Sequence, residues 1–488
     1  MNLSGGDKVV WVRGPGRTRI HLRTSVPGIT GGAWTRPTHM SGPRHLVSID
    51  DLSLAEIREL FERAQEFAQD PRAWAALCPG LISASLFYEP STRTRLSFES
   101  AMLRLGGGVV TAADMRQSSA SKGESLADTV RVVGGGYADI IVLRHPSEGA
   151  ARLAASYSSV PVINAGDGSH EHPTQTLCDL YNLYVEHGRI EGIDVVLAGD
   201  LRYSRTIHSF AYALARFGAN IICVPQAGFE MPEYVLQRLR EEFGVEPLRA
   251  DATRLGSLAA ASDAMYLTPQ KPHQLSLFTD ARGWKVDRVD AVYMTRPQTE
   301  RHGADDNKSE YLRLGKRAMA EESLRQAVVM HPLPRRDEIS EEMDSDPRSI
   351  YFKQAARGVP IRMAILGTLL GRLDSQAEPG AAQVQRYPVT VGDNPCPNTT
   401  CISHTETRHV LPSYQLASRS PLRAHCAWCS QELPFTFVAC TSTGHYHQAG
   451  AACLRRVRPD HLVFLRDEGQ ARALGFEPPQ RSTRPCPQ

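Results

Sequence analysis

A run of hydroxyl and guanidinium side chains follows an apolar stretch near residue 90. Residues 81–87 read as a buried strand, and residues 96–105 carry apolar side chains at helical spacing before Gly106. Between them, residues 91–95 read Ser-Thr-Arg-Thr-Arg. On such a strand-to-helix turn the first backbone N–H groups lack helical partners, and the helix dipole favours an anion. The run therefore predicts a phosphate site; the simpler alternative is a Ser/Thr helix cap with exposed arginines.

Similar polar residues follow other predicted strands. Strand-like and helical stretches alternate over residues 45–375, which predicts an α/β architecture with parallel sheets. The residues after these strands are Ser118 and Lys122, Arg144, His172 and Gln175, Arg205, Arg296 and Gln298, and Leu333-Pro334-Arg335. Ligands of open α/β sheets bind beyond the carboxyl ends of the strands. We therefore expect one anion-binding site shared by two sheets.

The chemistry of this site would be positioning and electrostatics. No Walker or dinucleotide fingerprint is visible, and no Ser/His/Asp arrangement can be argued. His172, in a His-Pro-Thr-Gln run, would donate to a carbonyl oxygen as charge develops there. The alternative for a single histidine is a surface or core residue.

Several motifs, in one order, make residues 45–375 resemble the catalytic chain of the aspartate carbamoyltransferase family. They are Ser91-Thr92-Arg93-Thr94-Arg95, Ser121-Lys122-Gly123-Glu124-Ser125, Arg144-His145-Pro146, His172-Pro173-Thr174-Gln175, Gly199-Asp200-Leu201 with Arg205-Thr206, Thr295-Arg296-Pro297-Gln298, and His331-Pro332-Leu333-Pro334-Arg335. The resemblance implies transfer of the carbamoyl group from carbamoyl phosphate to L-aspartate, giving N-carbamoyl-L-aspartate and phosphate. It places this step in pyrimidine biosynthesis and requires no catalytic cofactor.

The resemblance also implies a role for each motif. The carbamoyl-phosphate site would comprise Ser91, Thr92, Arg93, Thr94, Ser118, Lys122, Arg144, His172 and Gln175. Of these, Arg93, Thr94, Arg144 and His172 would be catalytic, and Gln175 would hold the carbamoyl nitrogen. The aspartate site would comprise Lys122, Arg205, Arg296, Gln298, Leu333 and Pro334. Ser118 and Lys122 would come from a neighbouring subunit, so the expected unit is a homotrimer with shared sites, alone or in a larger assembly.

Two alternatives remain beside this interpretation. Ornithine carbamoyltransferases share the Ser-Thr-Arg-Thr-Arg run, but they resemble a His-Cys-Leu-Pro pattern where residues 331–334 read His-Pro-Leu-Pro. A cationic acceptor would also be repelled by Arg296 and Lys122. The other alternative, a non-catalytic scaffold for pyrimidine-pathway partner proteins, is disfavoured because no charged motif position is degraded.

The cysteines predict one structural zinc ion. Of the ten, Cys78, Cys178 and Cys223 precede residue 390, and the others crowd into residues 396–486. Cys396 and Cys401, then Cys426 and Cys429, form a paired-knuckle pattern suited to one tetrahedral ion. The alternative is a set of unrelated free thiols.

The sequence of residues 396–404 also resembles the zinc domain of the aspartate carbamoyltransferase regulatory chain. In that chain a nucleotide-binding domain precedes the zinc domain, whereas here only a short linker, residues 376–390, stands there. We therefore expect no CTP/ATP site, and a zinc domain that braces catalytic chains.

The last segment, residues 436–488, is harder to interpret. Cys440, Cys453 and Cys486, with His445 and His447, are candidates for a second metal site. Residues 473–479 faintly resemble zinc modules of DNA alkylation repair proteins, but the expected paired cysteines are missing.

Composition sets the remaining limits. The 488 residues are 41% hydrophobic and 22% charged with a net charge of +2, which is typical of a globular protein without a nucleic-acid surface. No run reaches the length of a membrane span, and a cytoplasmic location is expected. The expected division is an arm (1–43), a carbamoyl-phosphate domain (44–185), an aspartate domain (186–345), a returning helix (346–375), the linker (376–390), a zinc domain (391–435) and a tail (436–488).

Overall fold

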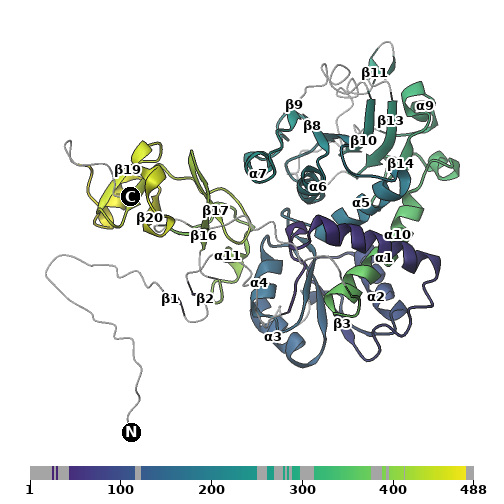
Figure 1. The fold of residues 1–488 in the computed structure, drawn as a ribbon, viewed down its shortest axis with the longest axis horizontal. Helices are drawn as coiled ribbons and strands as arrows, with labels where there is room; N and C mark the ends of the chain where they lie inside the picture. The colour runs from purple at the N-terminus through teal and green to yellow at the C-terminus, as the bar shows by residue number, and fades with distance from the viewer. Residues whose placement is uncertain are drawn as a thin grey trace, which may run out of the picture.

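The computed structural model describes residues 25–26, 29–30, 43–115, 123–249, 261–268, 279–280, 283–284, 288–296, 313–374, 387–391, 395–410 and 413–479. Nearly all of the arm expected over residues 1–43 lies outside these ranges. Two parallel sheets with flanking helices come first along the chain, and a mixed sheet follows (Figure 1). The predicted fold class, two parallel α/β domains and a small β domain, is confirmed.

The first domain is built on a four-stranded parallel sheet of order β4-β3-β5-β6. Its strands are β3 (Ile82–Phe87), β4 (Gly108–Ala112), β5 (Ile140–His145) and β6 (Val162–Asp167). Its helices are α1 (Leu54–Gln69), α2 (Thr92–Arg104), α3 (Leu126–Gly136) and α4 (Ala150–Tyr157). Consecutive residues of β5 belong to different apolar clusters, because side chains of a strand alternate between the two faces of its sheet. Both faces are therefore covered, as parallel sheets require.

The second domain has a six-stranded sheet of order β14-β13-β10-β7-β8-β9, parallel throughout. The strands are β7 (Asp194–Gly199), β8 (Asn220–Pro225), β9 (Leu248–Arg249), β10 (Ala261–Leu267), β13 (Arg288–Met294) and β14 (Val328–Met330). Helices α6 (Arg205–Arg216) and α7 (Glu233–Phe243) accompany it. In this domain too, neighbouring residues of β7 belong to different apolar clusters.

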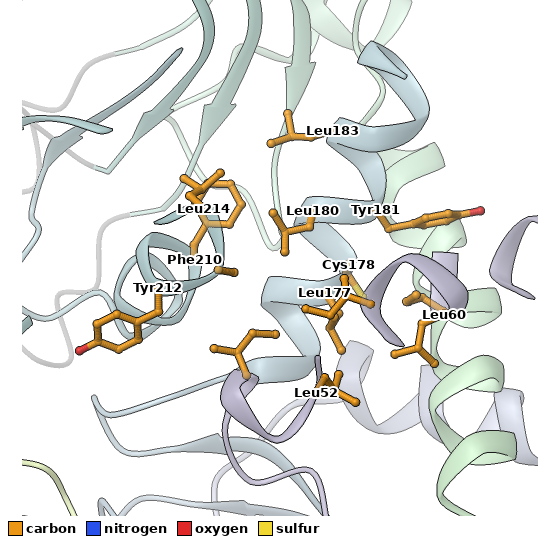
Figure 2. Packing of buried hydrophobic residues seen from close by; sticks show 14 of the residues in the cluster. Leu52, Leu60, Leu177, Cys178, Leu180, Tyr181, Leu183, Phe210, Tyr212 and Leu214 are labelled. Carbon is orange, nitrogen blue, oxygen red and sulfur yellow. The ribbon is translucent and has the colours of Figure 1, made fainter. Parts of the chain in front are cut away.

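Two long helices join the domains: α5 (Pro173–His187) and α10 (Tyr351–Leu369). Helix α10 contacts α1, α2 and α5, and α5 also contacts α6 of the second domain. In Figure 2, Leu177, Leu180 and Leu183 of α5 lie among apolar side chains of both domains. One continuous core therefore fixes α5, whose first turn carries His172 and Gln175.

The remaining elements before residue 387 are short. They are β1 (Ser25–Val26), β2 (Ile29–Thr30), η1 (Ile49–Asp51), β11 (Thr279–Asp280), β12 (Gly283–Trp284), α9 (Lys316–Met319), η5 (Glu322–Leu324) and η6 (Glu341–Ser345). None of the helices in the described ranges is long and apolar enough to cross a membrane.

The C-terminal domain, residues 387–479, is one six-stranded sheet of order β17-β16-β15-β20-β18-β19. Its elements are β15 (Tyr387–Val391), α11 (Ile402–Thr405), β16 (Tyr414–Arg419), β17 (Leu422–Cys426), β18 (Phe437–Cys440), β19 (His445–Gln448), η7 (Ala452–Arg456), η8 (Pro459–His461), β20 (Leu462–Leu465) and α12 (Glu468–Ala473). Strand β15 starts inside the expected linker and pairs with both β16 and β20. The zinc domain (391–435) and the tail (436–488) expected from the sequence therefore share one sheet, in which β15 pairs with β20.

The C-terminal domain docks on the first domain beside α4 (Figure 1). The backbone of Glu148 bonds both to Thr400 O (3.0 Å) and to Ile402 N (2.8 Å). Arg152 Nη1 donates to the carbonyls of Ala427 (2.8 Å) and Trp428 (3.1 Å). One cluster of buried apolar residues runs through both domains, so the contact is an extension of the core.

The close approach of Gly149 to Trp428 gives a test of this docking. Gly149 has φ 87°, and an added Cβ would lie 2.9 Å from the Trp428 backbone. Gly188 has φ 73° with nothing within 4 Å of such an atom, so it is the matched control. We expect Gly188→Ala to lower the free energy of unfolding by about 1 kcal/mol through backbone strain alone. Gly149→Ala should lower the free energy of unfolding by ~1–3 kcal/mol more than Gly188→Ala does, because of overpacking against Trp428. It should also make the C-terminal domain more accessible to protease. Equal losses in urea unfolding would contradict this interface.

Candidate active site and metal centre

The predicted phosphate turn begins α2. Ser91 is its N-cap residue, and its side chain makes no capping hydrogen bond to the described backbone of the helix. Thr94 is buried, whereas Thr92 and Arg93 are exposed. The Ser91 side chain therefore does not compete with an anion for the first N–H groups of α2.

Guanidinium groups from both domains surround this turn. Arg144, at the end of β5, donates to Ala165 O (3.2 Å) and pairs with Glu89 (3.2 Å), which fixes it beside the first sheet. Partial burial, and then the positive charge of Arg296, lower the pKa of Arg93. Arg296 follows β13 in the second domain, so its positive charge acts on Arg93 from the other domain. Such a pair is stabilised by a bound anion.

His172 is held at the start of α5. Its backbone N–H donates to Ser209 Oγ on α6 at 3.3 Å, and its Nδ1 lies 3.4 Å from Thr174 Oγ1. Pro173 occupies the first turn of the helix, where its missing N–H costs nothing. The buried imidazole is therefore fixed between the two domains.

Asp167, which the sequence motifs do not single out, ties the two loops that carry Arg144 and His172. Its Oδ2 accepts from Gly149 N (2.9 Å) after β5, and its Oδ1 accepts from Glu171 N (3.1 Å). His170 Nδ1 lies 3.2 Å from Oδ2. Burial alone would raise the pKa of Asp167, but His170 and these hydrogen bonds lower it. The Gly-Asp-Gly sequence at 166–168 was the available signal.

The loop after β14 is held by hydrogen bonds among its own residues. His331 Nδ1 accepts from Leu333 N at 2.8 Å, and its Nε2 lies 2.8 Å from Glu338 Oε1. Leu333 has φ 54°, and the Leu333–Pro334 bond is cis. The arrangement holds the loop carbonyls in one orientation, as required of hydrogen-bond acceptors for an amine.

Four predicted site residues cannot be placed in this geometry. Ser118, Lys122 and Gln298 lie outside the described residues. Arg205 begins α6, but its side chain is not described.

The metal centre comprises Cys396, Cys401, Cys426 and Cys429, all buried, with sulfur atoms within 4.8 Å of one another. Cys396 and Cys429 sulfurs are 3.5 Å apart, and those of Cys401 and Cys426 are 3.8 Å apart. Four thiolates at about 2.3 Å from one tetrahedral ion lie about 3.8 Å from each other. The donor set therefore fits zinc.

Other potential ligands in the described residues are weaker. Cys453 Sγ lies 3.7 Å from His447 Nδ1, but no group of three or more ligands forms around them in the ranges searched. Cys486 lies outside the described residues. His187, Asp263 and Asp290 do form such a group, yet both carboxylates are paired with arginines.

Comparisons with known proteins agree with this geometry. Family models match residues 44–185 as the aspartate/ornithine carbamoyltransferase carbamoyl-P binding domain and residues 261–369 as the Asp/Orn binding domain. Residues 394–438 match the metal-binding domain of the aspartate carbamoyltransferase regulatory chain.

Whole relatives are similar over the catalytic part. The chain is 43% identical over 332 residues to the aspartate carbamoyltransferase catalytic subunit of Methanocaldococcus jannaschii, and 42% identical over 334 residues to that of Thermoplasma acidophilum. Each match covers 67% of this chain and 98% of the relative. The solved M. jannaschii catalytic subunit matches with a TM-score of 0.55 at 42% identity, covering 67% of this chain and 98% of that one. A Trypanosoma cruzi aspartate transcarbamoylase with carbamoyl phosphate and aspartate matches at 0.53 and 34%, covering 67% and 95%.

Proposed function

The chain belongs to the aspartate carbamoyltransferase family, and from this we propose that its interdomain site transfers the carbamoyl group of carbamoyl phosphate to L-aspartate. The observation that carries the proposal is that the two halves of the catalytic part match a carbamoyl-P binding domain (residues 44–185) and an Asp/Orn binding domain (residues 261–369), with Arg93 in the first and Arg296 in the second. One cation suits a phosphate at the helix terminus, and the other suits a carboxylate of the acceptor.

The carbamoyl-phosphate half-site lies at the carboxyl end of the first sheet. Ser91, Thr92, Arg93, Thr94 and Arg144 would bind the phosphate. Thr94, Arg144 and His172 would donate to the carbamoyl oxygen, and Gln175 would accept from the carbamoyl nitrogen. Ser118 and Lys122 would complete the site from a neighbouring subunit.

The aspartate half-site lies at the carboxyl end of the second sheet. Arg205, Arg296 and Gln298, with Lys122 of a neighbour, would bind the two carboxylates. The carbonyls of Leu333 and Pro334 would accept from the amine and direct it toward the carbamoyl carbon.

The reaction then needs no cofactor. The aspartate nitrogen bonds to the carbamoyl carbon, and the charge on the carbamoyl oxygen is stabilised by its donors, each worth roughly 10²–10³ in rate. The carbon–oxygen bond to phosphate breaks, and the departing phosphate takes the amine proton. Holding both substrates in one cleft supplies the rest of the acceleration.

Parallel assays with aspartate and ornithine test the substrate. Because Arg93 and Arg296 make the cleft cationic, we expect turnover with aspartate and at least 10³-fold lower kcat/KM with ornithine, of the order expected when a charged group is left unpaired. Adding CTP should change neither rate, because a short linker stands before the zinc domain where the regulatory chain has its nucleotide-binding domain. Comparable rates with ornithine would overturn the acceptor assignment.

We further propose a homotrimer, alone or within a larger cytoplasmic assembly that serves pyrimidine synthesis. Leu96 and Leu103 on α2 are 51% and 59% exposed, and Val110 on the edge strand β4 is 42% exposed. These apolar side chains belong to two elements that contact each other, and exposed apolar side chains gathered in this way are typical of an interface between subunits. Mixing two inactive variants, Arg93→Ala and Lys122→Ala, should restore a measurable fraction of activity, since some shared sites then contain no substitution. Activity that stays at zero in mixtures shown to exchange subunits would contradict shared sites.

A further inference from the structure

A buried carboxyl group, that of Asp179, lies where α5, β13 and α10 meet. Its Oδ1 accepts hydrogen bonds from Gln175 Nε2 at 2.8 Å and from Tyr293 OH at 2.8 Å. Gln354 Nε2 on α10 lies at 3.4 Å from the same oxygen. Asp179 is fully buried, and Tyr293 and Gln354 are also buried. Three elements therefore converge on one oxygen atom.

This contact fixes how the Gln175 amide is turned. The bond runs from Gln175 Nε2 to Asp179 Oδ1, and the ionised carboxylate only accepts hydrogen bonds, so the amide presents its NH2 group to Asp179. The amide oxygen of Gln175 is then turned away from Asp179 at the first turn of α5, where it can accept a hydrogen bond from a ligand. A carbamoyl group carries an NH2 donor at its carbon, whereas an acetyl group carries a methyl group there.

The same carboxyl group is tied to the aspartate half-site. Tyr293 belongs to β13, the strand that leads to Arg296, and its ring stacks on Tyr266 at 4.2 Å. Gln354 Oε1 accepts from the backbone N–H of His331 at 2.8 Å, at the start of the loop that holds Leu333. The position of Asp179 is therefore set by both domains and is not free to follow Gln175.

Burial raises the pKa of Asp179 to about 7, against the opposing effect of its hydrogen-bond donors. Its second oxygen, Oδ2, has no hydrogen-bond partner in the described part of the chain. An asparagine at this position would keep the accepting oxygen and place its nitrogen where no bond is lost.

We propose that Asp179 is a positioning residue that holds the Gln175 amide with its oxygen toward the carbamoyl nitrogen, and so selects carbamoyl phosphate over acyl phosphates that lack this amine. The inference rests on the proposed function and adds a determinant of donor specificity to it.

The test measures two constants for each variant: the KM for carbamoyl phosphate, and the inhibition constant of acetyl phosphate competing with it. The quantity compared is the ratio of the inhibition constant to the KM, which is high when the site prefers carbamoyl phosphate. For Asp179→Leu we expect the KM to rise about tenfold, as for one lost hydrogen bond, while the inhibition constant stays unchanged. Asp179→Asn should restore the wild-type ratio. Gln175→Ala should by itself lower this ratio. Adding Asp179→Leu to Gln175→Ala should lower the ratio no further.

The control for simple destabilisation is Asn182→Ala. Asn182 is also buried on α5 and bonds to Arg357 of α10 at 3.0 Å, but it has no described contact with Gln175. It should lower the melting temperature and leave the ratio unchanged.

Several outcomes would overturn the inference. One is an unchanged ratio in Asp179→Leu, and another is an equal rise of both constants in that variant. The third is an unchanged ratio in Gln175→Ala, an experiment that does not depend on whether the Asp179 variants fold. Wild-type protein that does not carbamoylate aspartate would instead overturn the proposed function, so the two failures are distinguishable.

Discussion

Replacing Arg93 with alanine is expected to lower kcat/KM for carbamoyl phosphate by about 10³-fold without unfolding the protein. The guanidinium lies on an exposed turn, so its removal leaves no cavity in the core. Partial desolvation, and then the positive charge of Arg296, lower the pKa of Arg93, so an anion bound beside Arg93 would relieve the repulsion between the two cations. The loss should therefore be in anion binding and in stabilisation of the transition state.

The matched control is Arg104→Ala, the same change on the same helix. Arg104 is exposed at the far end of α2, where it bonds to Ser100 at 3.3 Å. Steady-state kinetics should show it within about threefold of the wild type, as for most exposed side chains. If Arg93→Ala retained most of its activity while folding normally, the phosphate site would have to lie elsewhere.

The second large effect is expected from Cys426→Ser. Zinc bound by four thiolates contributes about 10–16 kcal/mol to folding of small zinc domains, so losing one ligand should unfold the C-terminal domain. We expect metal analysis to show that the zinc content falls from one ion per chain to nearly none. Because Ser430 lies 3.3 Å from His170 and Thr400 bonds to Glu148, the loops around Asp167 should loosen too. The KM for carbamoyl phosphate should then rise, and amide exchange of residues 145–171 should accelerate.

Cys440→Ser is the control for this change. Cys440 is a buried cysteine of the same sheet, but it is outside the four-thiol group. It should keep its zinc and the protection of residues 145–171 against exchange. Full zinc content in Cys426→Ser would refute the ligand set.

Local spacing was sufficient for the parts of the site that lie on one turn or one knuckle. The Ser-Thr-Arg-Thr-Arg run was expected at a strand-to-helix turn, and α2 starts at Thr92 directly after its N-cap Ser91. The four cysteines were expected to meet, and they do. On the turn, the geometry is set within a few residues, and in the metal centre each pair of cysteines is close in sequence while the paired spacing itself indicates that the two pairs share one ion.

The C-terminal sheet was less predictable. Residues 437–465 gave no clear pattern, yet they supply three strands of the sheet that contains β15. Strand pairing depends on partners far apart in the chain, as between Thr390 and Val463. A short run of apolar residues indicates a strand without indicating its neighbour.

By itself, the sequence determined the order of motifs, the parallel α/β architecture, the zinc knuckles and the membership in a carbamoyltransferase family. Only the tertiary structure decided which buried groups hold these motifs. Asp179 meets Tyr293 across 114 residues and Gln354 across 175, and His170 meets Ser430 across 260. Such contacts arise when separate domains close around α5 and α4, and no local period records which polar group will face another once both are buried. The residues proposed to touch substrate were thus visible in the sequence, while the buried groups that contact them were not.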